Sequence, residues 1–250
     1  MKQFNRDFWG KMLSFLMVVT LSLSLTACGQ DSETNQPAKK SQTTKDSAKE
    51  NSNQTDGTPA DGAEVAGSGN ILIAYFSVPL NDGVDTVARA SRKESDDGTF
   101  GNVRFMANVI QKNVGGELFS IESAKGYPED DMDDLLEVGY DEKADNARPE
   151  LTAHIENLDQ YDTIFVGYPN WNADLPMPLY SFFEEYDFSG KTIIPFVAHG
   201  GSGASGTVDT IAELEPDATV VDNPATVYWD ELDDAESIVT DWVKSLNITK

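Results

Sequence analysis

Residues 163–172 read TIFVGYPNWN, an apolar run of strand length that ends in a loop of polar and aromatic residues. Two other stretches repeat this design: residues 71–77 read ILIAYFS, and residues 192–203 read TIIPFVAHGGSG. Near-continuous apolar runs are typical of strands buried on both faces of a parallel sheet. Ligands of such sheets bind outside the carboxyl ends of the strands, where the strand order reverses. The three loops therefore predict one composite site for a small, flat, anionic ligand.

Strand-like and helix-like segments alternate from residue 70 to the end of the chain, which predicts a doubly wound α/β domain. The expected strands are 71–76, 118–121, 163–167, 192–198 and 219–221, with 226–228 as a continuation of the last. The expected helices are 102–114, part of 129–144, 177–186, 208–214 and 234–246. Five parallel strands of this kind predict the order 2-1-3-4-5, with the first and third strands beside the switch point.

The connection between the first strand and the first helix is unusually long. It runs from about residue 77 to 101, whereas such connections usually have about 2–6 residues. Turn-forming residues such as Pro79 and Gly83 occur along it. We interpret it as an insertion into a ligand loop, with residues 78–98 acting as a lid or a partner-binding segment. An inert surface excursion is the alternative.

The N-terminus has the pattern of an export signal. Basic residues precede an apolar stretch at 12–27, which is shorter than a typical transmembrane helix. The stretch ends in LTAC at 25–28, and Cys28 is the only cysteine. This end closely resembles the lipobox of bacterial lipoproteins, which implies cleavage before Cys28 and diacylation of its sulfur. Residues 1–27 are then a signal peptide, and a lipid anchor on Cys28 holds the chain on the extracytoplasmic face of a bacterial membrane.

Residues 28–69 follow the predicted cleavage site and contain almost no large apolar side chains. Such a segment cannot bury enough surface to offset the entropy of ordering it, so it is expected to be a disordered tether. The folded domain is then residues 70–250. No cysteine remains in it for disulfides or thiol chemistry.

The predicted domain is strongly acidic. The first 69 residues carry −1 of the formal net charge of −25, which leaves −24 for residues 70–250. A domain of this charge is not expected to bind nucleic acid, because binding depends on cationic contacts to phosphates. It is expected to attract basic patches on partner proteins, although the acidity has an alternative explanation as a contribution to solubility.

The first loop meets its helix at Gly101, Asn102 and Val103. A helix N-terminus presents unpaired N–H groups and the positive end of the helix dipole, so it binds phosphate without a lysine. Ser77 is a further hydroxyl donor, and Gly101 permits close approach of the backbone. The alternative is that Asn102 only caps the helix.

The other two loops offer an aromatic face and exposed backbone. Trp171 follows Pro169 and Asn170, and it either stacks on an aromatic ligand or packs over its own loop. Residues 199–203 contain three glycines that leave backbone groups open to a planar ligand. His199 is either a proton donor or a histidine that only caps its loop.

A metal centre is not expected in the domain. His154 and His199 are the only histidines and the mature domain lacks cysteine, so a zinc site lacks ligands. The acidic run at 129–134 lacks the glycine and the spacing of an EF-hand loop.

The motifs taken together resemble the flavodoxin-like proteins over nearly all of residues 70–250. They are YFS at 75–77, GN at 101–102, YP at 127–128, NARPEL at 146–151, GYP at 167–169, LPMP at 175–178, YDFSGK at 186–191 and HGGSG at 199–203. The first loop departs from the family pattern because the insertion splits it, and Phe100 and Val103 replace hydroxyl residues. In the second loop, Asn172 replaces an aromatic residue.

The resemblance implies bound FMN and names the residues that hold it. The phosphate contacts are Ser77, Gly101, Asn102 and Val103. One side of the isoalloxazine ring is lined by Pro169, Asn170, Trp171 and Asn172. The other side is lined by His199, Gly200, Gly201, Ser202 and Gly203.

The function implied by this resemblance is electron transfer through the flavin. The expected protein is a membrane-tethered electron carrier whose redox partner proteins bind through basic patches. Two alternatives stay open: an NAD(P)H-dependent flavin or quinone oxidoreductase of the same fold, and a non-redox surface lipoprotein that has lost FMN. The fold alone does not decide among them.

Overall fold

The computed structural model describes residues 70–78 and 92–248. The predicted signal peptide (1–27), Cys28, the predicted tether (28–69) and residues 79–91 of the predicted insertion lie outside these ranges. The described residues all fall within one compact unit, residues 57–250. No helix among them has the length and apolar character needed to cross a membrane.

A fully parallel sheet forms the centre of the domain. Its strands are β1 (Asn70–Tyr75), β4 (Glu117–Ser120), β5 (Tyr161–Pro169), β6 (Thr192–His199), β7 (Thr219–Val220) and β8 (Ala225–Tyr228). The order is β4-β1-β5-β6, and both β7 and β8 pair with the far edge of β6. The predicted doubly wound α/β fold and its strand order are therefore confirmed.

The fifth position of the sheet is divided between two short strands. β7 pairs with Thr192 and Ile193 at the start of β6, whereas β8 pairs with residues 196–199 at its end. Pro224 lies in the break, where its lack of an N–H excludes it from a continuous ladder. The break also leaves the carbonyl of Asn223 free to accept a hydrogen bond of 2.9 Å from Trp242 Nε1.

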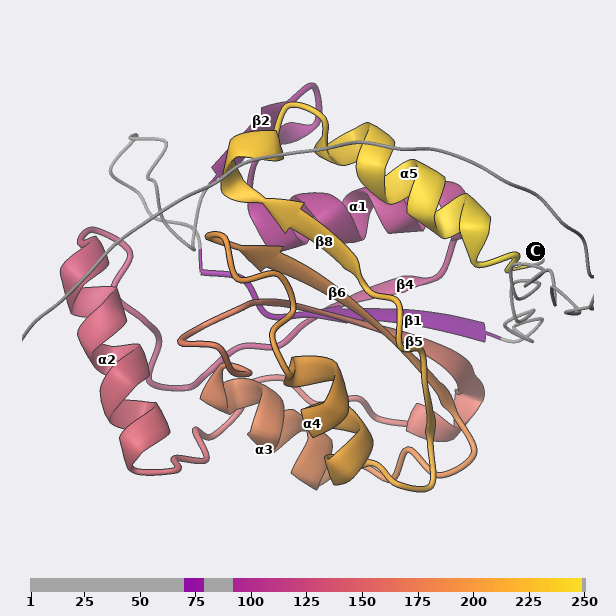
Figure 1. Cartoon of the computed structure of the whole chain (residues 1–250). Helices are drawn as coiled ribbons and strands as arrows, with labels where there is room; N and C mark the ends of the chain where they lie inside the picture. The colour runs from indigo at the N-terminus through magenta and orange to yellow at the C-terminus, as the bar shows by residue number, and fades with distance from the viewer. Residues whose placement is uncertain (1–69, 79–91, 249–250) are drawn as a thin grey trace, which may run out of the picture. The chain divides into compact units, whose positions relative to one another are not determined.

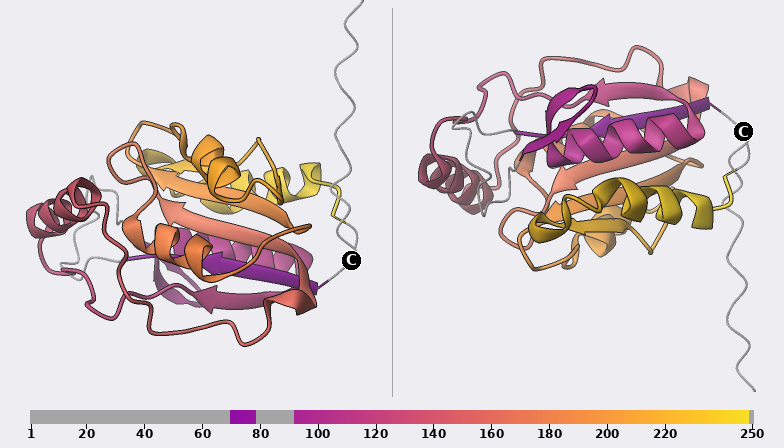
Figure 2. Two further views of the ribbon diagram at one scale, coloured as in Figure 1. Left: turned by 90° about the horizontal axis from the view of Figure 1, so that it is seen from below. Right: turned by 90° about the horizontal axis from the view of Figure 1, so that it is seen from above.

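Helices cover both faces of the sheet (Figures 1 and 2). The helices α1 (Asn102–Val114) and α5 (Ala235–Ser245) cover one face, and α3 (Met177–Glu185) and α4 (Thr207–Leu214) cover the other. Two short 3-10 helices, η1 (Leu158–Gln160) and η2 (Trp229–Glu231), precede β5 and follow β8. Two buried apolar clusters result, one on each face. Because β5 and β6 contribute side chains to both clusters, their apolar runs are nearly continuous.

Helix α2 (Met132–Ala144) stands at the end toward which the arrowheads of β6 and β8 point (Figure 1). It buries only Leu135 and Gly139. Its N-terminus is capped by Asp131, whose Oδ1 accepts hydrogen bonds from the N–H groups of Asp133 at 2.8 Å and Asp134 at 3.2 Å. These carboxylates favour the positive end of the helix dipole. The acidic run at 129–134 is thus a helix start.

The described part of the predicted insertion contains a hairpin that the sequence pattern did not indicate. Strands β2 (Arg92–Ser95) and β3 (Gly98–Gly101) pair in antiparallel register. Lys93 forms an ion pair of 2.6 Å with Asp233, and Phe100 packs on the cluster beneath α1 and α5. These contacts anchor residues 92–101 to the domain, while the lid or partner-binding role remains a prediction.

The close approach of β5 and β6 depends on Gly167. Gly167 lies opposite Phe196 in the parallel register, and a Cβ atom at Gly167 would lie 2.1 Å from Phe196 Cζ. Both residues lie in fully buried parts of their strands. The aromatic ring therefore occupies the space that any larger residue at position 167 needs.

We expect Gly167→Ala to lower the free energy of unfolding by about 1–3 kcal/mol, because overpacking forces side chains or backbone to shift. Urea denaturation of the purified chain measures the effect. Phe196→Leu in the same chain provides room for the new methyl group, so the double variant should lose less stability than the sum of the two single variants. Additive losses would contradict the proposed contact.

Candidate functional site

The three predicted ligand loops lie together because β1, β5 and β6 are neighbours in the sheet. The main-chain ladder continues past the strand ends: Phe76 N–H donates to the Gly167 carbonyl, and Asn170 N–H donates to the Ala198 carbonyl, both at 2.8 Å. The loops that begin at Ser77, Asn170 and Gly200 therefore leave one edge of the sheet side by side. This edge includes the switch point between β1 and β5, where ligands of such sheets bind.

The first loop ends at an uncapped helix. Gly101 is the N-cap residue of α1, and no side chain within residues 70–78 and 92–248 makes a cap hydrogen bond there. The first turn of α1 also contains no acidic residue. Its N–H groups thus remain available to an anion, with the positive end of the helix dipole behind them. The Val103 side chain is buried in the core, so this residue offers the site its main chain only.

Asn102 has a buried side chain with an unused acceptor. The residue is 5% exposed, and its Oδ1 atom has no hydrogen-bond partner among the described residues. The neighbouring cation, Arg104, is already engaged: its guanidinium lies 5.0 Å from the centroid of the Tyr75 ring and hydrogen-bonds to the Tyr75 hydroxyl. An anion at this helix end therefore depends on main-chain N–H groups.

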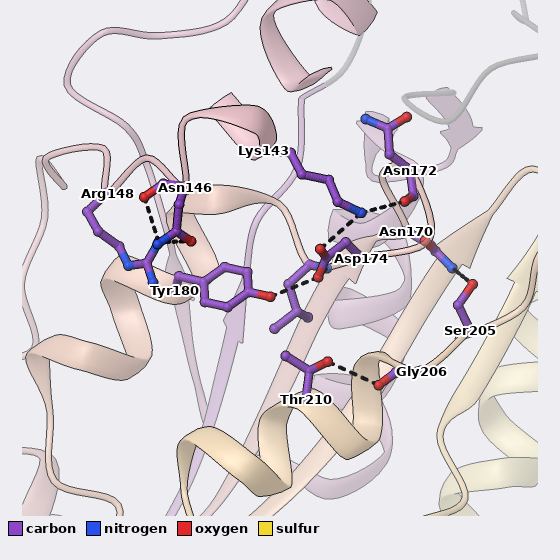
Figure 3. A network of polar contacts seen from close by, with 11 residues as sticks. Lys143, Asn146, Arg148, Asn170, Asn172, Asp174, Tyr180, Ser205, Gly206 and Thr210 are labelled. Carbon is purple, nitrogen blue, oxygen red and sulfur yellow. Dashed lines mark hydrogen bonds and ion pairs between the residues drawn. The ribbon is translucent and has the colours of Figure 1, made fainter. Parts of the chain in front are cut away.

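The second loop is joined to the third by Asn170. Its Nδ2 atom donates to the Gly203 carbonyl at 2.7 Å. The same atom donates to Ser205 Oγ at 2.9 Å (Figure 3). Its Oδ1 atom is buried and has no hydrogen-bond partner among the described residues. One end of the amide thus fixes the distance between the two loops, and the other end can accept a hydrogen bond from a ligand.

Trp171 lies in the apolar core and is only 6% exposed. Its ring packs edge to face on Phe76 and Tyr127, each at a centroid distance of 5.4 Å. A Cβ atom at Gly139 of α2 would lie 3.4 Å from the ring. In this arrangement the indole packs on Phe76, Tyr127 and α2 and not over its own loop, and stacking on a ligand remains a prediction.

The third loop contains the conformations that its glycines allow. Gly201 and Gly203 have φ angles of 120° and 59°, and Gly200 to Ser202 are exposed. Gly201 N–H donates to His199 Nδ1 at 3.0 Å, which requires this nitrogen to be unprotonated. The His199 ring stacks on Tyr228 of β8 at a centroid distance of 5.7 Å. Burial lowers the pKa of His199, and the nearby Glu231 carboxylate opposes this shift.

A match to the family model described as Flavodoxin extends over residues 98–246, which is more than half of the chain. The chain belongs to the flavodoxin family. No curated protein gives a significant match.

Two solved structures, both from Bacteroides, support the same fold. A candidate flavoprotein from Bacteroides uniformis is 26% identical, with a TM-score of 0.54, over 70% of this chain and 98% of its own. A second from Bacteroides eggerthii is 24% identical, with a TM-score of 0.56, over 72% and 99% of the two chains. A flavoprotein from Lactobacillus acidophilus, solved in complex with FMN, is 17% identical over 67% and 98%, with a TM-score of 0.48.

All thirteen residues predicted to contact the ligand in this flavodoxin fold lie in the three loops or at their edges. Three neighbours were missed: Lys143 of α2, which contacts the second loop, Ser205, and Tyr228 beneath His199. The sequence could have indicated Tyr228 as a site residue, because it ends a predicted strand at the same edge of the sheet. Nothing in the acidic α2 sequence distinguishes Lys143.

One groove in the described part of the chain lies apart from this site. This groove of about 620 Å³ lies between α2 and the segments 123–125 and 147–150, and it includes none of the predicted contact residues. No group of three or more His, Cys, Asp or Glu side chains within residues 70–78 and 92–248 is arranged to hold a metal ion.

Asn170→Ala should separate the second loop from the third. We expect the free energy of unfolding to fall by about 1–3 kcal/mol, because the Gly203 carbonyl loses its side-chain donor in a partly buried place. Urea denaturation without added ligand measures the loss. Asn157→Ala, at an exposed position without a side-chain cap bond, is the control and should change little. Equal losses in the two variants would contradict a specific role for Asn170.

His199 should make the third loop sensitive to acid. A histidine whose pKa is lower in the folded than in the unfolded state contributes stability that is present above the unfolded value, about 6.5, and is lost as the pH falls through the folded value. Protonation of Nδ1 also removes the acceptor used by Gly201 N–H. His199→Asn keeps an acceptor that does not titrate, so stability between pH 7 and pH 5 should fall less than in the unmodified chain. Thermal unfolding across this range measures it, with His154→Asn as the control, and equal pH profiles for His199→Asn and the unmodified chain would refute the assignment.

Proposed function

We propose that this chain is an FMN-binding electron-transfer protein tethered to the outer face of a bacterial membrane. The observation that carries the cofactor assignment is the uncapped N-terminus of α1, together with the buried amide oxygens of Asn102 and Asn170, which have no hydrogen-bond partner among the described residues. An unpartnered buried acceptor is unfavourable by about 1–3 kcal/mol, so a ligand that supplies donors there stabilises the fold.

The chemistry of FMN matches this set of groups. Its phosphate is an acceptor for the N–H groups of Asn102 and Val103, with Ser77 as a further donor. Its ribityl hydroxyls and ring N–H are donors for the free oxygens of Asn102 and Asn170. When bound, FMN supplies one- and two-electron redox chemistry, while the protein positions it and sets its electrostatic surroundings.

The second and third loops would bind the ring from its two sides. Pro169 to Asn172 line one side, and His199 to Gly203 line the other. Trp171 contributes mainly by fixing the shape of its loop, because its ring packs on Phe76 and Tyr127. The exposed glycines permit close approach of a planar edge to the backbone.

The acidity of residues 70–250 favours basic patches on the proteins that exchange electrons with this one. Opposite charges increase the rate of encounter and raise its dependence on salt. Association with a redox partner should therefore weaken as ionic strength rises.

FMN titration of the purified full-length chain tests the cofactor assignment. We expect quenching of flavin fluorescence, with riboflavin binding at least about tenfold more weakly because it lacks the phosphate. Asn102→Asp should weaken FMN binding by a similar factor through repulsion at the helix end, and leave riboflavin nearly unchanged. Asn108→Asp, six residues further along α1, makes the same charge change away from the site and is the matched control.

A chain that stays colourless and leaves FMN fluorescence unchanged would refute the cofactor assignment and favour the non-redox alternative. Equal binding of FMN and riboflavin would refute the phosphate site at α1. The FMN-loaded chain can also be tested for oxidation of NADPH with a quinone as acceptor. Turnover above about 1 per second would favour the oxidoreductase alternative over the electron carrier.

The proposed membrane tether rests on the signal-like N-terminus and on Cys28. Two acyl chains provide a stable anchor, because burial of each CH₂ group contributes about 0.8 kcal/mol. A segment of the composition of residues 28–69 then links the anchor to the domain without folding of its own.

Cys28→Ala should abolish lipid attachment. In a bacterial host labelled with radioactive palmitate, we expect label on the unmodified chain and none on the variant. The variant should also lose its anchor and leave the membrane fraction after high-salt washing. Label retained by Cys28→Ala would contradict lipidation at this residue.

A further inference from the structure

The turn that follows Trp171 contains a residue in a backbone conformation that it rarely adopts. Asn172 and Ala173 have φ angles of 57° and 58°, in the left-handed region that asparagine tolerates and alanine rarely adopts. Main-chain hydrogen bonds close the turn in both directions: Trp171 N–H to the Asp174 carbonyl at 3.2 Å, and Asp174 N–H to the Trp171 carbonyl at 3.0 Å. Contacts from elsewhere must help to hold two consecutive residues in this region.

Lys143 of α2 makes such contacts. Its Nζ atom donates to the Asn172 carbonyl at 2.9 Å and forms an ion pair of 3.1 Å with Asp174 Oδ2 (Figure 3). The other oxygen of that carboxylate accepts hydrogen bonds from Leu175 N–H and from the Tyr180 hydroxyl, both at 2.8 Å. One ammonium group thus contacts the middle and the end of the turn, and the carboxylate that receives it is itself held by α3.

The turn is connected to the rest of the candidate site on both sides. Asn170, immediately before it, donates to Gly203 and Ser205 of the third loop. Trp171 packs on α2 at Gly139, one helical turn before Lys143. A change in the turn therefore alters the position of the second loop relative to the third.

We infer that Lys143 is a positioning residue, which holds the 171–174 turn in its left-handed conformation and so fixes the second loop against the third. It also neutralises the Asp174 carboxylate beside the loops of a domain with a charge of −24, the value left for residues 70–250. On the proposed function, loss of Lys143 would leave this carboxylate without its cation and so disfavour the more negatively charged reduced flavin.

The alternative is an ordinary surface ion pair, which typically contributes little. The Lys143 and Asp174 side chains are 39% and 21% exposed, so neither is fully solvated. Unlike a simple ion pair, Lys143 also bonds to a main-chain carbonyl in a left-handed turn. Lys244 and Asp241 supply the comparison: their ion pair is also 3.1 Å long, but both side chains are more than 60% exposed and lie on α5.

Amide hydrogen exchange on the full-length chain, without FMN, tests the positioning role. In Lys143→Met, the amides of Trp171 and Asp174 should exchange about tenfold faster, because the turn opens more often. Lys143→Arg keeps a charged donor and should restore most of the protection. Lys244→Met should leave these amides unchanged. Equal protection in Lys143→Met and the unmodified chain would overturn the inference.

A second measurement tests whether the positioning of the second loop by Lys143 affects the binding and the midpoint potential of FMN. Lys143→Met should bind FMN about tenfold more weakly and lower its midpoint potential, with recovery in Lys143→Arg and no change in Lys244→Met. A tenfold loss of preference for reduced over oxidised FMN corresponds to about 30 mV for a two-electron couple. If the unmodified chain binds no FMN, the proposed function fails and the exchange experiment still decides the role of Lys143. Unchanged FMN affinity and potential despite faster exchange would overturn the link to the flavin.

Discussion

The parallel register of β1, β5 and β6 is the constraint on which the rest of the structure depends. It brings the ends of three strands that are far apart in sequence to one edge of the sheet. The register of β5 against β6 places Gly167 opposite Phe196, where only glycine leaves room for the ring. A shift by one residue would turn the side chains of a strand to the opposite face and so move them from one buried cluster into the other, whose packing they do not match.

An acidic domain that receives an anionic ligand needs local sources of positive potential. In the described residues the end of α1, which has no side-chain cap, is such a source, whereas the ammonium of Lys143 is paired with the Asp174 carboxylate. A helix end acts over about one turn, so it can hold an anion although the surrounding surface is negative. The long-range field then remains available for attraction of basic partners.

Most of the architecture could be predicted from the sequence, because apolar runs and helical spacing depend on local patterns. Helix 102–114 and the break in the fifth strand follow from such patterns. The sequence located the ligand loops but not the positions of their side chains. It left Trp171 compatible either with stacking on a ligand or with packing inside the protein. The packing on Phe76 and Tyr127 became visible only in the structure. Lys143 lies 29 residues before Asn172, whose carbonyl it binds, and a contact between residues so far apart has no local signal in the sequence.

Contacts within the protein hold the loops of the candidate site together. Asn170 joins the second loop to the third, and Lys143 and Asp174 hold the turn that follows it. Because these groups are already ordered, binding of a ligand need not be accompanied by a large loss of loop entropy, and more of the interaction free energy appears as affinity. Among the described residues, the Oδ1 atoms of Asn102 and Asn170 have no hydrogen-bond partner. A preformed shape with unused acceptors is the arrangement expected of a site that selects its ligand by matching donors.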